Sequence, residues 1–271
     1  MDEPIFSLKD VYFSYLGKYP ALRGIDMDIR QGEKITVLGA NGSGKSTLLH
    51  LLDGLIFPQQ GAIRAFGVAL QEGVFNDADF SRDFRKKVGL VFQNPDIQLF
   101  CPTVEEDICF GPLQLGVGEK ETACRLEKIA DDLGIDDLLQ RSPHQLSVGE
   151  KRKVAIASTL IIEPQVLVLD EPTAGLDPKT SCAIVEIILR ANSAGRTIIT
   201  ATHDLHIVEE ISDRVYVLSR EKKIARVEEP ERLLADSRFL EEHNLIHTHA
   251  HCHQRQAHTH PHQHPGPDHH H

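Results

Sequence analysis

The chain has 271 residues, of which 41% are hydrophobic, so it can bury the core of one domain, or of one domain with a subdomain. Its formal net charge of -11 argues against a nucleic-acid-binding role, which needs a basic surface against the phosphate backbone. The acidic N-terminus lacks a targeting pattern, no apolar run approaches the ~20 residues that span a bilayer, and the 5 cysteines show no CxxC spacing. We therefore expect reduced thiols and a protein that is neither secreted nor inserted into a membrane on its own.

The first part of the chain predicts β structure followed by one helix. Residues 7–16 alternate apolar and polar side chains, which is typical of a strand, and residues 24–39 predict a hairpin that ends in a buried strand over Lys34–Leu38. After a glycine-rich turn the period changes from strand to helix. The apolar stripe of that helix consists of Leu48, Leu49, Leu51, Leu52 and Leu55.

The rest of the chain predicts a helical subdomain and then a return to the sheet. Residues 94–158 have a mainly helical pattern, after which short β-branched runs alternate with an amphipathic helix. These strands are expected at residues 165–172, 196–204 and 214–219. The alternation predicts an α/β fold with a mostly parallel core sheet, an antiparallel β subdomain and a helical subdomain. We expect the domain to span residues 5–240, and a histidine-rich tail without regular structure to span residues 241–271.

Residues 39–46, GANGSGKS, match the Walker A pattern G-x-x-x-x-G-K-[ST]. The glycines let the backbone turn its N–H groups inward, and the following helix presents its positive dipole end to bound phosphate. We expect Lys45 to hold the β and γ phosphates of ATP and Ser46 to hold Mg²⁺; the alternative is a glycine-rich turn before an ordinary helix. The expected nucleotide contacts here are Gly39, Ala40, Asn41, Gly42, Ser43, Gly44, Lys45, Ser46 and Thr47.

A second buried strand ends in two adjacent carboxylates, Asp170 and Glu171. Acids at the carboxyl end of a parallel strand face the crevice where open α/β sheets bind ligands. We expect Asp170 to hold Mg²⁺ through its water shell, and Glu171 to orient and deprotonate the attacking water. The alternative is a solvated strand end.

These motifs form a series that resembles the ATP-binding cassette (ABC) family from residue 7 to about residue 236. In chain order the landmarks are Tyr15, the Walker A loop, Gln93, LSVGE over residues 146–150, Asp170 and Glu171, AGLD over residues 174–177, and His203 in TATHD. The resemblance implies an ATPase in which nucleotide is sandwiched between the Walker A loop of one chain and the signature loop of a second, so that one site needs two chains. Ser147 and Gly149 would offer a hydroxyl, N–H groups and a helix N-terminus to the partner's γ-phosphate.

The resemblance also implies roles for the remaining landmarks. Tyr15 would stack on adenine, although it could be an ordinary strand aromatic. Gln93 would contact Mg²⁺ and the attacking water and report to a membrane partner, and His203 would sense the γ-phosphate; each could instead be structural. Asp177 would fix the dimer interface rather than take part in the chemistry.

The signature LSVGE departs from the usual LSGGQ of the family at two positions. Val148 replaces a glycine, and a positive φ there would be costly for a β-branched residue, so either the loop does not need it or the contact is weakened. Glu150 replaces glutamine and adds negative charge near the partner's phosphate. That charge can be offset by Lys151, Arg152 and Lys153. We expect these changes to affect the rate, not the class of protein.

The cassette occurs without membrane helices, a second Walker A loop or a long coiled coil, which favours an importer subunit over other members of the family. VFQNPDIQLF, residues 91–100, resembles the Gln-loop region of energy-coupling-factor ATPases, particularly the cobalt and nickel branch. The resemblance implies ATP-driven Ni²⁺ or Co²⁺ uptake at the cytoplasmic face of the cell membrane. The implied partners are a second ABC ATPase chain, a transmembrane coupling subunit and a substrate-specific membrane subunit. The alternatives are a coupling ATPase for another substrate, such as a vitamin, and a metal-buffering protein with a vestigial cassette.

The C-terminal tail carries H-x-H pairs interleaved with proline, rather than the unbroken histidine run of a purification tag. In an extended chain, residues i and i+2 project to the same side, so these pairs predict chelation by an extended arm. Neutral imidazole suits Ni²⁺ and Co²⁺ among other metals. The alternatives are a tag remnant and an inert tail. The expected ligands are His247, His249, His251, His253, His258, His260, His262 and His264.

Overall fold

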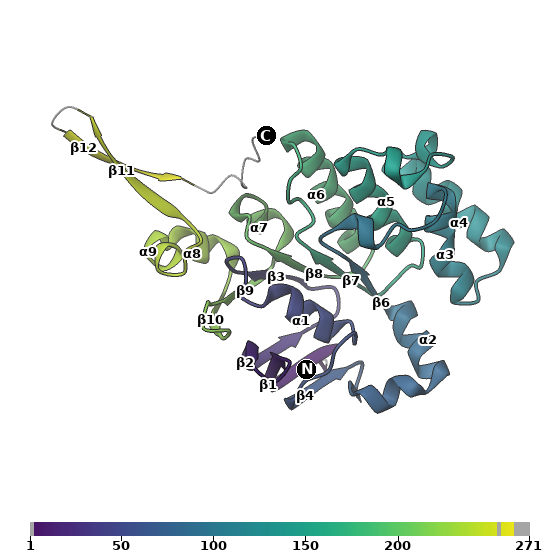
Figure 1. The fold of residues 1–271 in the computed structure, drawn as a ribbon, viewed down its shortest axis with the longest axis horizontal. Helices are drawn as coiled ribbons and strands as arrows, with labels where there is room; N and C mark the ends of the chain where they lie inside the picture. Colours follow the sequence, from purple (N-terminus) through teal and green to yellow (C-terminus); the bar gives the residue numbers. More distant parts are fainter. Residues whose placement is uncertain (1–2, 254–255, 263–271) are drawn as a thin grey trace.

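The computed structural model describes residues 3–253 and 256–262, with side chains described up to residue 246. A six-stranded sheet lies at the centre of the molecule, and a four-stranded antiparallel sheet lies on one side of it (Figure 1). Helices cover the other side and extend into a separate lobe (Figure 1). The expected α/β class, with its antiparallel and helical subdomains, is confirmed.

The central sheet has the strand order β10-β9-β3-β8-β7-β6. Its strands are β3 (Lys34–Leu38), β6 (Val88–Val91), β7 (Val166–Asp170), β8 (Thr197–Thr202), β9 (Arg214–Leu218) and β10 (Ile224–Glu228). All neighbouring pairs are parallel except β9 with β10. Every residue of β7 and β8 is buried, as expected for parallel strands covered on both faces. The carboxyl ends of the parallel strands meet at one edge, where Gly39, Glu171 and His203 follow β3, β7 and β8.

The antiparallel sheet and helix α1 share one apolar core. The elements are β1 (Phe6–Tyr15), β2 (Tyr19–Ile29), β4 (Gln60–Ala65), β5 (Val68–Ala69) and α1 (Lys45–Leu52). Four leucines of α1 are buried there with Val166 and Val168 of β7, whereas Leu167 and Leu169 belong to the core on the opposite face. This alternation follows from the two-residue period of a strand. Leu55, expected on the leucine stripe, lies beyond the helix end and is 45% exposed.

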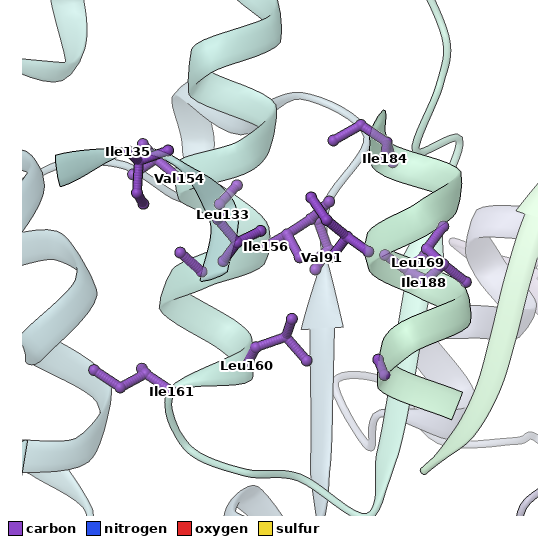
Figure 2. Packing of buried hydrophobic residues seen from close by; sticks show 14 of the residues in the cluster. Val91, Leu133, Ile135, Val154, Ile156, Leu160, Ile161, Leu169, Ile184 and Ile188 are labelled. Atoms are coloured by element: carbon purple, nitrogen blue, oxygen red, sulfur yellow. The ribbon is translucent and has the colours of Figure 1, made fainter. Parts of the chain in front are cut away.

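The opposite face of the sheet is covered by longer helices. These are α3 (Val104–Gln114), α4 (Glu119–Leu133), α5 (Val148–Leu160) and α6 (Pro178–Ser193), with single turns η2 (Pro95–Ile97), η3 (Asp136–Leu138) and η4 (Pro143–Gln145). Leu169 of β7 packs beside Ile184 and Ile188 of α6, and Ile156 of α5 lies beside Val91 of β6 (Figure 2). Helix α5 is thus anchored through its apolar side chains while its first residues form the signature loop.

A partly buried ion pair ties the Walker A helix to the segment η1 (Glu72–Asn76) and α2 (Ala78–Lys87). Arg85 of α2 donates through Nη1 to the carbonyl oxygen of Asp53 at 2.7 Å and to its Oδ2 at 2.8 Å. Asp53 follows the last residue of α1 and is 4% exposed. Burial raises the pKa of the Asp53 carboxyl to about 7, against the opposing effect of Arg85.

Replacing Arg85 by Met should lower the free energy of unfolding by about 2 kcal/mol at pH 8.5, because a buried carboxylate then loses its cation. The pKa of Asp53 is higher in the folded state than in the unfolded state, so folding favours the protonated carboxyl. The protonated Asp53 therefore contributes stability that is fully present below pH ~4 and is lost as pH rises through about 7. The loss in Arg85→Met should therefore be smaller at pH 5.5 than at pH 8.5. Denaturant unfolding at the two pH values measures it, with Arg82→Met on the exposed side of α2 as the control. An equal loss of unfolding free energy at both pH values would contradict the raised pKa of Asp53.

The packed body ends later than the sequence predicts. After α7 (Leu205–Ile211), α8 (Pro230–Ala235) and α9 (Ser237–Glu242), Leu245 and Ile246 are 6% and 5% exposed and belong to an apolar cluster with Val215 and Leu233. The folded unit therefore continues to Ile246, past the boundary expected at residue 240. Two apolar residues among histidines carry too weak a periodic signal to be assigned to a core from sequence.

The tail, expected to lack regular structure, has a described backbone that forms two antiparallel strands, β11 (His247–His253) and β12 (Gln256–His262). This hairpin stands away from the body (Figure 1). An alternating sequence is compatible with extended pairing because a strand repeats every two residues. The expected ligand His264 lies outside the described residues. Within the described part of the chain, no helix has both the length and the apolar character needed to cross a membrane.

Candidate active site

The Walker A loop joins β3 to α1, and two of its glycines, Gly39 and Gly44, are required by packing. Gly44 has a φ of 113°, and a Cβ there would lie 2.4 Å from the carbonyl oxygen of Ala21. A Cβ on Gly39 would lie 2.6 Å from Ser43 Oγ and 2.7 Å from the carbonyl oxygen of Leu218. Neither position can accept a side chain without a shift of backbone or of a buried hydroxyl. Ser43 Oγ itself is buried with no hydrogen-bond partner among the described residues, which leaves it free for a ligand.

Lys45, the first residue of α1, places its ammonium group at the carboxyl edge of the sheet. The residue is 6% exposed, and its Nζ donates to the carbonyl oxygen of Gly39 at 2.7 Å. The same Nζ lies 3.1 Å from Glu171 Oε1. The structure thus brings the two expected phosphate-site residues into direct contact, and the ammonium group is placed to serve the phosphates that a Walker A loop binds.

Glu171 is the centre of a three-residue network. Its Oε2 lies 2.9 Å from His203 Nδ1, and its φ of 47° is a left-handed conformation that is costly for residues other than glycine and that recurs at functional sites. Burial raises the pKa of the Glu171 carboxyl, but the His203 hydrogen bond and the Lys45 charge outweigh it and hold the pKa below its ordinary value. The hydrogen bond to Glu171 raises the pKa of His203. Glu171 is therefore ionised at neutral pH, as a base toward water must be.

Asp170 and Ser46 form an oxygen donor set that fits Mg²⁺. Asp170 is 5% exposed, and its Oδ1 is buried with no hydrogen-bond partner among the described residues. Burial raises the pKa of Asp170, opposed by a hydrogen bond from the Ser46 hydroxyl. A carboxylate oxygen without a partner beside a hydroxyl is a ligand set suited to a hard divalent cation. Ser46 and Asp170 would hold the ion, which when bound would neutralise charge on the nucleotide phosphates.

Tyr15 and Gln93 border this site from two other elements. Tyr15 is 44% exposed at the end of β1, and its hydroxyl is 3.1 Å from Thr47 Oγ1 of α1. This contact sets the partly exposed ring, which also packs against Phe13, beside the Walker A helix, where the resemblance implies adenine stacking. Gln93 is exposed and follows β6, which pairs with β7 in a register that sets Val91 beside Leu169. The Gln93 backbone therefore continues beside the strand end that carries the two carboxylates.

The signature loop begins helix α5, on the sheet face opposite to α1. Ser147 is the N-cap, and a Cβ on Gly149 would lie 2.8 Å from Thr180 Cγ2 at the start of α6. Thr180 in turn donates its hydroxyl to the carboxylate of Asp177, the N-cap of α6, at 2.5 Å. Gly149 and Asp177 are thus connected through Thr180 at the start of α6, next to the N-cap Ser147 of α5.

Val148 is the first residue of α5 and is not among the residues with positive φ. Its side chain is 56% exposed. Of the two alternatives for this position, the loop does not need a glycine, because a helical conformation is open to valine. A glycine at this position would therefore restore no needed freedom.

Two cations near the site were missed or misread from the sequence. Arg152, expected only to offset charge, is 2% exposed and donates through Nη1 to the carbonyl oxygen of Phe92 at 2.9 Å, so it fixes the backbone next to Gln93. Lys222, in the turn between β9 and β10, donates to the carbonyl oxygen of Gly42 in the Walker A loop. No spacing rule connects positions so far apart in sequence.

Comparisons with known proteins agree with this geometry. Residues 22–174 match the family model described as ABC transporter. The chain is 48% identical over 225 residues to the nickel import ATP-binding protein NikO of Rhodobacter capsulatus, covering 82% of this chain and 88% of that protein. It is 43% identical over 225 residues to the energy-coupling factor transporter ATP-binding protein EcfA of Methanothermobacter thermautotrophicus, covering 82% of this chain and 70% of that protein.

Solved structures give the same result. cbiO1 from Clostridium perfringens, described as part of the ABC transporter complex cbiONQ, matches with a TM-score of 0.76 and 35% identity, covering 90% of this chain and 96% of that one. A dimeric ATP-binding cassette in a post-hydrolysis state, bound to ADP and Pi, matches with a TM-score of 0.75 and 27% identity, covering 83% of this chain and 98% of that one. The chain therefore belongs to the ABC transporter family. It is an ABC-type ATPase, which hydrolyses ATP with Mg²⁺ to ADP and phosphate.

Proposed function

We propose that this chain is the ATP-hydrolysing subunit of a membrane importer for a divalent transition metal, nickel or cobalt. The observation that carries the ATPase part is the buried Lys45–Glu171–His203 network at the carboxyl edge of the central sheet. The metal rests on the relatives, one named for nickel import and one a part of cbiONQ, and on the histidine-rich tail. A coupling ATPase for another substrate is the second candidate function, because one relative is an energy-coupling factor ATP-binding protein, EcfA.

The proposed site needs two chains. Lys45 turns from Glu171 to the β and γ phosphates when ATP binds, which frees the carboxylate to take a proton from the attacking water. His203, on the other oxygen of that carboxylate, holds it in place and reaches the γ-phosphate. The partner's Ser147 and Gly149 close the site, and the solved dimer with ADP and Pi supports this arrangement. An intact network of this kind disfavours a vestigial cassette in a metal-buffering protein.

An exposed apolar surface downstream of Gln93 supports docking of a transmembrane coupling subunit. Ile97 and Phe100 are 63% and 65% exposed, and Phe110 and Leu113 on α3 are 43% and 44% exposed. The rings of Phe100 and Phe110 meet edge to face at 5.0 Å. Exposed apolar clusters of this kind mark protein interaction sites. The surface is continuous with the Gln93 loop, so a docked subunit could sense the nucleotide site; this would keep the chain at the cytoplasmic face of the membrane.

Phe100→Glu should lower recovery of the membrane subunits with the purified chain by about tenfold or more, because an aromatic anchor becomes a charge. ATP-dependent dimerisation of the isolated chain should remain. Co-purification from membranes in mild detergent measures the first effect, with Val227→Glu on β10, also an exposed apolar residue, as the matched control. Unchanged recovery with Phe100→Glu would contradict the docking surface.

The tail is proposed as a metal-binding segment that is separate from the ATPase site. Its backbone is extended over His247–His253 and Gln256–His262, the conformation in which i and i+2 residues share a side. Several imidazoles at high local concentration favour avid chelation of Ni²⁺ or Co²⁺. Protonation competes for the same lone pairs, so binding should fade as pH falls through about 6.5.

Truncation after Ile246 should leave ATP hydrolysis within about twofold of the full chain while removing most low-affinity Ni²⁺ or Co²⁺ binding. The cut belongs after Ile246 because Leu245 and Ile246 are buried in the body. Calorimetric metal titration and an ATPase assay on the same protein measure both effects. A full-length control with the tail histidines changed to serine separates loss of imidazole from loss of chain. Unchanged metal stoichiometry, or collapsed ATPase activity, would show that the tail is misassigned.

A further inference from the structure

We propose that Glu150 is a positioning residue that sets the affinity of the ATP-bound dimer. In the monomer its carboxylate accepts the hydrogen bond of the signature Ser147 hydroxyl, and it releases that hydroxyl when the partner's nucleotide binds. The proposal rests on the two-chain site proposed above and deepens it. It gives a function to the glutamate that replaces the usual glutamine of the signature.

The contact between the two side chains is close and reciprocal. The Ser147 backbone N–H and its hydroxyl both donate to Glu150 Oε2, each at 2.7 Å. In return, the Glu150 backbone N–H donates to Ser147 Oγ at 3.3 Å. These bonds form a capping box at the start of α5. The hydrogen bonds from Ser147 hold the pKa of the Glu150 carboxyl below its ordinary value, so the group is ionised.

This arrangement leaves the signature loop only partly ready for phosphate. The single hydroxyl hydrogen of Ser147 is directed to a carboxylate, so Oγ can offer only lone pairs to a phosphate oxygen, and that contact is repulsive. Val148 and Gly149, the first two residues of α5, keep N–H groups with no carbonyl partner within the helix. A γ-phosphate therefore meets two available donors and must displace Glu150 from the third.

The charge of Glu150 is only partly offset by cations: Lys153 and Arg141 attract the carboxylate and help to hold its pKa down, but neither forms an ion pair with it. Lys151 pairs with Asp96 at 2.7 Å, Arg152 donates to the carbonyl oxygen of Phe92 at 2.9 Å, and Lys153 donates to the carbonyl oxygen of Leu133 at 3.3 Å. Within residues 3–246, no lysine or arginine forms an ion pair with Glu150. The expected offset by these side chains is therefore not seen as a direct contact. The carboxylate opposes an approaching γ-phosphate both by its charge and by holding the hydroxyl.

Glu150→Gln is the informative change because glutamine can still accept from the Ser147 N–H and keep the helix cap, while its charge is gone. The measurement uses full chains that carry Glu171→Gln, which should accumulate the ATP-bound dimer. Sedimentation with MgATP then gives the dimer dissociation constant with and without Glu150→Gln. We expect the dimer to tighten about threefold for each of its two sites at low salt, a like-charge effect of the size seen for exposed charge pairs. The gain should shrink as salt rises, because screening weakens the repulsion.

A double-mutant cycle with Ser147→Ala separates the two parts of the proposal. In Ser147→Ala the effect of Glu150→Gln should be reduced, since no hydroxyl remains to be released. Equal or weaker dimerisation in Glu150→Gln, or a gain that salt does not change, would overturn the role of Glu150. Absence of any ATP-dependent dimer in Glu171→Gln alone would instead overturn the two-chain site and this inference with it.

Discussion

Glu171→Gln should lower the rate of ATP hydrolysis by about 10²- to 10⁴-fold while ATP binding persists, because a positioned general base contributes that much to the rate. The glutamine amide is nearly the same size but cannot take a proton from water. The phosphate contacts of Lys45 and the Walker A backbone remain, and the repulsion between the carboxylate and the γ-phosphate is removed. The variant should therefore accumulate as an ATP-bound dimer.

Release of inorganic phosphate under saturating MgATP measures the rate, and size-exclusion chromatography with light scattering measures the dimer. Glu186→Gln, which removes an exposed carboxylate on α6, is the matched control and should behave as the unaltered chain. Turnover in Glu171→Gln close to that of the control would show that another group activates the water.

Lys45→Ala should abolish detectable hydrolysis and weaken nucleotide binding by about 10²-fold or more, in line with the loss of a charged donor from an enclosed site. Because Lys45 is only 6% exposed, a cation from solvent cannot easily take the place of its ammonium group. Its removal also deprives the buried Glu171 of the ammonium group at 3.1 Å. Because that charge helps to hold the pKa of Glu171 down, the pKa of Glu171 should rise in this variant.

Equilibrium binding of a fluorescent ATP analogue, together with the phosphate-release assay, distinguishes lost binding from lost chemistry. Lys179→Ala at the start of α6 changes the net charge by the same amount and should leave both unaffected. Tight nucleotide binding in Lys45→Ala would mean that the loop backbone alone carries the phosphate affinity.

The sequence was sufficient to predict an element wherever its local pattern of residues fits only one secondary structure. The apolar run that ends in Asp170 and Glu171 is a buried parallel strand, and GANGSGKS lies between a strand and a helix, as its motif requires. The sequence could not show that Lys45 and Glu171 pair, nor that Arg152 reaches Phe92, because these contacts depend on strand order and helix packing.

Two other features could not be predicted from the sequence: the conformation at Val148 and the burial of Leu245 and Ile246. Val148 suggested strain, but helical φ removes it. Leu245 and Ile246 lie among histidines, yet they complete an apolar cluster against β9 and α8. In both cases the deciding quantity is the local conformation or the neighbouring surface, which one-dimensional spacing does not contain.

The proposed function is tested most directly by metal uptake in cells that lack other nickel and cobalt importers and that express this chain with the membrane subunits that co-purify with it. Cellular nickel and cobalt are measured after exposure to submicromolar metal, with the unaltered chain and with Glu171→Gln in parallel. Accumulation of one or both metals is expected only with the unaltered chain. Equal accumulation with Glu171→Gln, or no uptake of either metal by a complex that hydrolyses ATP, would contradict the proposed function.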